Sequence, residues 1–136
     1  MNVDIIQDGV ERMNINDLVQ KYYLSNDFNV LADKTKHDYQ YCAGVLLATE
    51  VDGKSLSEIR LTKMNGAIAR RGYEQWLGRG IYQANAITSV ARKVYSFGME
   101  MGYAESNPFA TYKRKTPHAR NTVWTKDQVT QFLDVA

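Results

Sequence analysis

A catalytic function would need side chains that can act as nucleophiles or bases. It holds nine tyrosines, two histidines and one cysteine. A tyrosine becomes a nucleophile only where neighbouring cations or a base activate its hydroxyl. The tyrosines here follow helical core patterns instead, and so do Trp76 and Phe97. We therefore expect no catalytic residue in this chain, and core packing rather than base stacking for its aromatic rings.

Metal, cofactor and phosphate-loop motifs are also missing from the sequence. Cys42 has no second cysteine to pair with, and no acidic cluster accompanies the two histidines. The "GRG" at residues 78–80 lacks the strand and helix that a phosphate loop needs around it. We predict no metal, no cofactor and no small-molecule substrate, with Cys42 as a small core side chain.

The strongest candidate for a binding surface is a polar stripe on the helical run that starts near Ala84. The stripe recurs every three or four residues, at Asn85, Ser89, Arg92 and Ser96. The opposite, apolar face consists of Ala84, Ile87, Ala91, Val94 and Tyr95. Asparagine can pair with adenine, and arginine with guanine or phosphate, so we predict that the stripe faces a DNA major groove. A solvated helix face is the alternative. The predicted contacts on or beside the stripe are Tyr82, Gln83, Asn85, Ser89, Arg92 and Lys93, with Thr88 on its polar flank.

Basic residues gather in the second half of the chain, although the net charge is only +2. Residues 60–120 hold eleven lysines and arginines against three acidic residues, whereas residues 1–30 hold two against five. A local excess of positive charge favours a phosphate-backbone partner, and solvated surface cations are the alternative. Further predicted phosphate contacts are Lys34, Thr35, Lys36 and His37 at a helix start, and Lys113, Arg114, Lys115 and Arg120 in a linker.

Apolar residues at helical spacing predict an all-α domain. We expect a first helix over about residues 16–25 behind an asparagine cap. A second helix should begin at Thr35, as its cap, and end at a turn over residues 50–55. A third should begin at a Thr62 cap and reach about Trp76.

The fourth helix carries the polar stripe and has clear stop signals. Gly102 can take the left-handed conformation after the helix, Tyr103 can pack back on the last turn, and Pro108 prevents continuation. A basic, proline-interrupted linker follows over residues 113–124. Another helix then begins with a capping box at Thr125.

The order of these features resembles the tyrosine recombinase (phage integrase) family over about residues 14–136. In that family the core-binding domain ends in a helix, a glycine turn and Asn-Pro, and a linker leads to the first catalytic-domain helix. The stretches that carry the resemblance are "LADKTKHDYQYCAGVLL", "KSLSEIRLTKMNGAIARR", "VYSFGMEMGYAESNPF" and "WTKDQVTQFLDVA". Two residues depart from the family pattern: Gly98 stands where alanine is usual, and Ala104 where a larger aliphatic residue is common.

The resemblance implies a SAM-like core-binding domain, a four-helix orthogonal bundle that forms half of a clamp around a recombination core site. It divides the chain into a lead (1–13), the core-binding domain (14–112), a basic linker (113–124) and the first helix of a truncated catalytic domain (125–136). The family's catalytic tyrosine and its phosphate-binding cations would lie beyond that helix. "HAR" at residues 118–120 is one residue shorter than the family's His-x-x-Arg. We therefore expect this fragment to bind DNA without cutting it, and the full-length protein to be a site-specific recombinase.

The resemblance also implies partners and a compartment. The expected partners are the double-stranded DNA of an attachment-site core and other recombinase protomers on that DNA. No apolar run approaches the roughly 20 residues of a membrane span, and the single cysteine suits a reducing cytoplasm, so we predict a cytoplasmic protein without membrane contact. Two other functions stay open: a non-catalytic helical interaction protein and a helix-turn-helix regulator.

Overall fold

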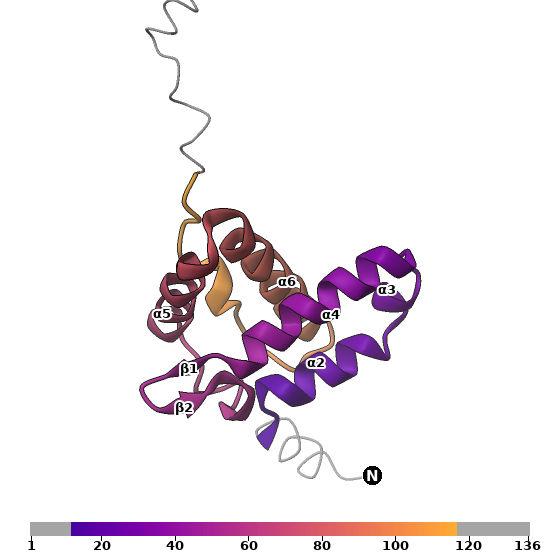
Figure 1. Ribbon diagram of the computed structural model, residues 1–136. Helices are drawn as coiled ribbons and strands as arrows, with labels where there is room; N and C mark the ends of the chain where they lie inside the picture. Colours follow the sequence, from indigo (N-terminus) through magenta and orange to yellow (C-terminus); the bar gives the residue numbers. More distant parts are fainter. Residues whose placement is uncertain (1–11, 117–136) are drawn as a thin grey trace, which may run out of the picture.

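The computed structural model describes residues 12–116 and shows a mostly helical chain (Figure 1). The all-α prediction is therefore confirmed. Residues 1–11, Arg120 and the predicted helix from Thr125 lie outside the described residues. No helix in residues 12–116 is long and apolar enough to cross a membrane. The elements, in chain order, are α2 (Ile15–Tyr23), α3 (Asn26–Asn29), α4 (Asp33–Ala48), β1 (Glu50–Val51), β2 (Lys54–Ser55), η1 (Leu56–Glu58), α5 (Gly66–Trp76), η2 (Leu77–Arg79), α6 (Ile81–Glu100) and η3 (Pro108–Ala110).

Helix α2 begins with the asparagine cap that the sequence predicts. The Asn14 side chain accepts a hydrogen bond from the Asp17 amide at 2.8 Å, and the Asp17 carboxylate accepts one from the Asn14 amide at 3.1 Å. This reciprocal capping box satisfies two backbone donors at the helix start. The helix ends before its predicted limit, because the Ser25 hydroxyl caps the short helix α3 and accepts from the Phe28 amide at 3.3 Å.

The predicted threonine caps of the next two long helices are wrong. Helix α4 begins at Asp33 behind Ala32, so Thr35 lies inside its first turn. Helix α5 begins at Gly66 behind Asn65, whose side chain accepts from the Ile68 amide at 2.9 Å. Thr62 lies instead in a turn, in which the amides of Lys63 and Met64 donate to the Arg60 carbonyl at 2.9 and 3.1 Å. The residues before this turn pair with the chain ahead of α2. The Leu61 amide donates to the Met13 carbonyl at 2.9 Å, and Asn14 and Arg60 form an antiparallel bridge.

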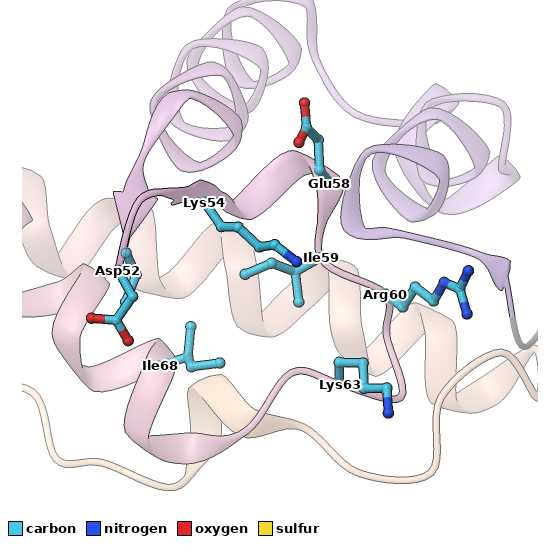
Figure 2. Close-up of a pocket in the computed structure, with 8 residues that line it drawn as sticks. Asp52, Lys54, Glu58, Ile59, Arg60, Lys63 and Ile68 are labelled. Atoms are coloured by element: carbon cyan, nitrogen blue, oxygen red, sulfur yellow. The ribbon is translucent and has the colours of Figure 1, made fainter.

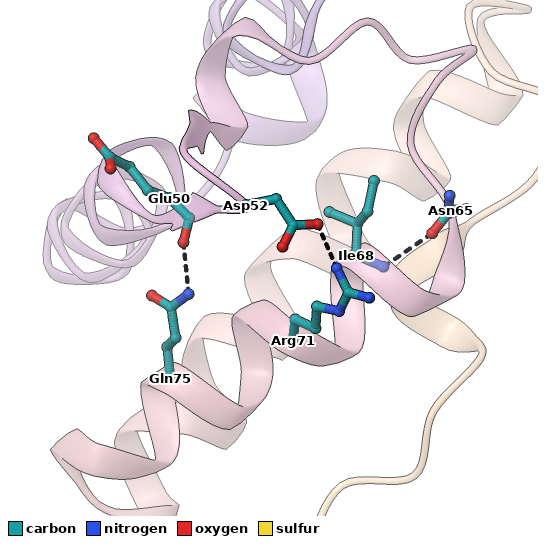
Figure 3. A network of polar contacts seen from close by, with 6 residues as sticks. All are labelled: Glu50, Asp52, Asn65, Ile68, Arg71 and Gln75. Atoms are coloured by element: carbon teal, nitrogen blue, oxygen red, sulfur yellow. Dashed lines mark hydrogen bonds and ion pairs between the residues drawn. The ribbon is translucent and has the colours of Figure 1, made fainter.

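The predicted turn over residues 50–55 is a β-hairpin that docks on α5 (Figure 3). Asp52 and Gly53 both have positive φ angles, which a tight two-residue hairpin turn requires. Arg71 forms an ion pair with Asp52, and the Gln75 side chain donates to the Glu50 carbonyl at 2.5 Å. Both contacts come from α5, one turn apart, and they fix the hairpin against this helix.

Helix α6 has the buried face and the stop that the sequence predicts. All five residues of the predicted apolar face are buried. Gly102 adopts a φ of 80° just after the helix. The ring of Tyr103 lies edge-on to that of Phe97, with ring centroids 6.3 Å apart. The left-handed glycine thus turns the chain so that Tyr103 packs back on the last helical turn, as predicted.

Gly98, which departs from the family pattern, lies where α2 and α6 come closest. A Cβ atom at this position would stand 3.0 Å from Cδ1 of Leu18 and 3.3 Å from its Cδ2. Leu18 is fully buried and has little room to move. A larger residue at position 98 would therefore require the Leu18 side chain to shift, and the close packing of α2 on α6 here favours a glycine in a helix interior.

The segment after α6 runs back along the bundle and adds an aromatic side chain to the core. Phe109, in η3, is fully buried. Its ring stacks on Trp76 of α5, with centroids 6.3 Å apart, and meets Tyr95 of α6 at 5.6 Å. Figure 1 shows this returning segment between α5 and α6. Phe109 therefore completes the core at the seam between these two helices.

The hydroxyl of Tyr95 has no hydrogen-bond partner in the described part of the chain, and burial raises the pKa of this tyrosine. We predict that Tyr95→Phe leaves the free energy of unfolding unchanged or raises it by about 1 kcal/mol, because it removes an unsatisfied buried group. Tyr112→Phe is the matched control: it leaves the buried Thr88 hydroxyl without its partner and should lower the free energy of unfolding by about 1–3 kcal/mol. Urea unfolding measures both. Equal destabilisation by the two variants would contradict the prediction.

Candidate functional site

The polar stripe of α6 is covered along much of its length by the chain's own residues 107–115, which we call the strap. The strap begins at Asn107 and crosses the start of α5. At this crossing a Cβ atom on Gly66 would collide with Thr111. Three of the four stripe residues, Asn85, Ser89 and Arg92, contact it through hydrogen bonds. The surface predicted to meet a partner is therefore first of all an intramolecular contact.

Arg92 makes the most extensive of these contacts. Its Nε donates to the Phe109 carbonyl at 2.6 Å, and its Nη2 donates to the Tyr112 carbonyl at 2.8 Å. The guanidinium also lies 5.7 Å from the centre of the Tyr112 ring. In return, the Asn107 side chain donates to the Arg92 carbonyl at 3.1 Å. The planar guanidinium thus binds two carbonyls of the strap at once, a geometry that lysine does not reproduce.

Thr88, predicted on the polar flank of the stripe, is instead completely buried. Its hydroxyl lies 2.8 Å from that of Tyr112, and either group could be the donor. Burial raises the pKa of Tyr112, while the Thr88 hydrogen bond and the Arg92 charge oppose part of the shift. Helical periodicity considers only the residues of one helix. It therefore predicted Thr88 next to the solvent and could not reveal that the strap covers it.

Asn85 lies at the other end of the strap, next to Tyr73 of α5. The Tyr73 hydroxyl donates to Asn85 Oδ1 at 2.8 Å and accepts from the Lys115 amide at 2.7 Å. Asn85 Nδ2 donates to the Lys115 carbonyl at 3.0 Å. Between the two ends, Arg114 donates to the Ser89 hydroxyl at 2.5 Å. The backbone of the strap is thus held at several points along the helix.

The side chains that face outward along this surface are mostly cationic. Lys93 on α6 and Lys113, Arg114 and Lys115 on the strap are exposed. An open pocket of about 490 Å³ lies on this surface, lined by Arg92, Ala110, Thr111, Tyr112, Lys113 and Arg114. Tyr82, which is 64% exposed, and Gln83 lie in the first turn of the same helix. No acidic side chain lines this pocket, so it suits an anionic partner.

The predicted cluster at the start of α4 lies at a different place. Lys34 forms an ion pair with Asp38 at 3.6 Å, and the Lys36 ammonium lies 5.9 Å from the centre of the Phe28 ring. Thr35 is half-buried and His37 is exposed. The rings of Phe28 and Phe97 both pack on Tyr22, which places this cluster near the C-terminal end of α6. Asn85 is twelve residues before Phe97, roughly 18 Å along the helix, so this cluster lies far from the Asn85 end of the stripe.

A pocket of about 540 Å³ beside the hairpin holds cations that the sequence did not single out (Figure 2). Lys54, Arg60 and Lys63 line it around an apolar floor of Ile59 and Ile68. Two acidic residues, Asp52 and Glu58, also line the pocket. Asp52 forms its ion pair with Arg71 of α5, and Figure 2 shows the Glu58 carboxylate pointing away from the three cations. The three cations lie on a strand and an irregular segment, where helical periodicity assigns no common face. Only their closeness in the sequence could have indicated that these three cations lie together.

Replacing Arg92 by lysine tests its contact with the strap. Arg92→Lys keeps the charge but removes the double hydrogen bond to the carbonyls of Phe109 and Tyr112, so we expect a loss of about 1.5–3 kcal/mol in the free energy of unfolding. Lys93→Ala, on the exposed side of the same turn, should change it by less than about 0.5 kcal/mol. Urea unfolding of both variants checks this. An Arg92→Lys variant as stable as the unmodified protein would show that the contact contributes little.

No family model, no curated protein and no solved structure matches the chain. Its function must therefore be inferred from its own residues. Within residues 12–116 these offer two concave surfaces with an excess of positive charge, one along the strap and one beside the hairpin. Among the same residues no three His, Cys, Asp or Glu side chains converge as metal ligands would.

Proposed function

We propose that this chain is the core-binding module of a tyrosine recombinase, a SAM-like four-helix orthogonal bundle that clamps the core of a DNA attachment site. In this proposal the module binds double-stranded DNA beside other recombinase protomers. The catalytic domain of the full-length protein follows from about Thr125. The fragment itself binds without cutting.

The observation that carries the proposal is the row of outward cations on the strap. Lys113, Arg114 and Lys115 are consecutive, exposed and attached to a backbone that α5 and α6 already hold. Lys93 adds a further charge from α6. DNA presents a regular array of phosphates, and each phosphate that a cation neutralises releases condensed counterions. A pre-ordered basic segment is well suited to such a partner, because fewer residues must be ordered on binding.

The other predicted contacts have definite places in this proposal. Tyr82 and Gln83 are exposed in the first turn of α6, and in this proposal they meet base edges while the strap follows the DNA backbone. The cluster of Lys34, Lys36 and His37 lies near Phe97, roughly 18 Å along α6 from Asn85. In this proposal it meets phosphates outside the stretch that the strap contacts.

The competing function is a helical module that binds another protein. Its support is a pair of exposed apolar side chains on either side of α3: Leu24 is 82% exposed and Val30 69% exposed. Exposed apolar groups close together can mark a protein interface. Protein binding of this kind would depend little on salt, whereas phosphate binding depends on it steeply, so a salt series separates the two functions.

We predict that the chain binds duplex DNA with a steep salt dependence that originates mainly in the strap. Replacing Lys113, Arg114 and Lys115 together by glutamine should reduce the slope of log K against log salt by up to about three, with little change in sequence preference. Fluorescence anisotropy on an attachment-site core duplex and on a scrambled duplex measures both quantities.

A matched variant removes the same number of charges elsewhere. Lys54, Arg60 and Lys63 replaced by glutamine should leave the salt slope unchanged, because these residues lie beside the hairpin and away from the strap. The reverse pattern, in which only the hairpin variant loses slope, would move the interface to that pocket. Absence of binding to either duplex at low salt, for the isolated chain and the full-length protein alike, would favour the protein-binding function.

A further inference from the structure

We propose that Tyr73 and Asn85 form a clasp that closes on the backbone of Lys115 and holds the basic strap in position before DNA arrives. Asn85 is then a positioning residue and not a reader of bases. This inference rests on the proposed function, because it concerns how the strap is presented to DNA. The clasp itself, however, is a property of the free protein and can be measured without any ligand.

The hydrogen-bond directions in the clasp permit one arrangement only. The amide of Lys115 can only donate, so the Tyr73 hydroxyl accepts from it and must send its own proton elsewhere. That proton goes to Asn85 Oδ1, which leaves Asn85 Nδ2 to donate to the carbonyl of Lys115. The three bonds, of 2.7, 2.8 and 3.0 Å, therefore engage both backbone groups of one residue. Each group polarises the next, which strengthens the set.

The clasp joins three separate parts of the fold. Tyr73 comes from α5 and is only 3% exposed, with its ring 5.0 Å from that of Tyr112. Asn85 comes from α6, and Lys115 is the last but one of the described residues. Because the Tyr73 ring is fixed in the core, its hydroxyl is a rigid anchor. The position of the Lys115 backbone is thus set by the packing of α5 against α6.

Two fixed points then bracket the cations of the strap. Arg92 holds the carbonyl of Tyr112, and the clasp holds both backbone groups of Lys115. Only Lys113 and Arg114 lie between them, and Arg114 is bound in addition to Ser89. Ordering a flexible segment on binding weakens affinity, so a strap ordered in advance binds more tightly without any extra charge. Opening the clasp should therefore lower affinity and leave the salt slope unchanged.

The clasp competes with the base-reading role that the sequence suggests for Asn85. Reading adenine uses both the amide oxygen and the amide nitrogen of asparagine. Here both atoms are occupied, one by Tyr73 and one by Lys115. Asn85 could meet a base only after releasing the strap, and that release would free the cations the proposed interface depends on.

The test compares Tyr73→Phe, which removes one oxygen atom, with Asn85→Ala, and uses Tyr41→Phe as a control on the exposed outer face of α4. Two measurements are made on each folded variant. Amide hydrogen exchange by NMR reports the protection of the Lys115 amide in the free protein. Fluorescence anisotropy across a salt series reports binding to an attachment-site core duplex and to a scrambled duplex.

We expect both clasp variants to speed exchange at Lys115 by about tenfold or more. Both should weaken binding by a similar factor, about 3- to 30-fold, on both duplexes and with an unchanged salt slope. Tyr41→Phe should change neither quantity. If Tyr73→Phe unfolds the chain, Asn85→Ala, at a half-buried position, still provides the exchange and binding results.

Three results would overturn the inference. Unchanged exchange at Lys115 in both variants would show that no clasp exists in solution. If Asn85→Ala lost affinity for the attachment-site duplex alone, and Tyr73→Phe did not, Asn85 would be a base reader after all. Faster exchange in a protein that binds neither duplex, as fragment or full length, would refute the proposed function and with it the role in DNA positioning, while the clasp as a structural feature would stand.

Discussion

The insertion of Phe109 between α5 and α6 is the constraint on which the rest of the structure depends. Its ring fills the space between Trp76 and Tyr95 and is fully buried. Burying one aromatic side chain contributes roughly 1.5–3 kcal/mol. Since Phe109 cannot leave this position without opening the core, the residues that follow it must begin on the seam between the two helices. The path of the strap follows from this one anchor.

The backbone of a returning segment brings polar groups against a helix, and these groups need partners. The polar stripe of α6 supplies them: Arg92 binds carbonyls near the start of the strap, and Asn85 with Tyr73 binds its end. Satisfying the backbone in this way leaves the strap's cationic side chains exposed. The polar residues that the sequence suggests as a recognition face thus hold a segment whose lysine and arginine side chains are exposed, one layer further out.

The helical class, the first helix cap and the end of α6 followed from local patterns. The buried positions of α6 and the Gly102 turn with Tyr103 are set by residues within a few positions of one another. The predicted cap of α5 was wrong where a contact beyond that range intervenes. Residues 59–61 pair with residues 13–15, a turn closed on the Arg60 carbonyl follows, and the helix begins behind Asn65. Gly98 likewise makes sense only beside Leu18 of another helix.

The sequence alone determined which residues are charged, which helix faces are apolar and where helices stop, because these depend on side-chain chemistry and short-range spacing. It also identified the cations of the strap. Only the tertiary structure decided what the polar stripe contacts, since Asn85 and Tyr73 meet Lys115 across 30 and 42 residues of chain. Periodicity distinguishes the apolar face of a helix from its polar face. It cannot say whether the polar face meets water, a partner or a distant segment of the same chain, because all three satisfy the same hydrogen-bonding groups.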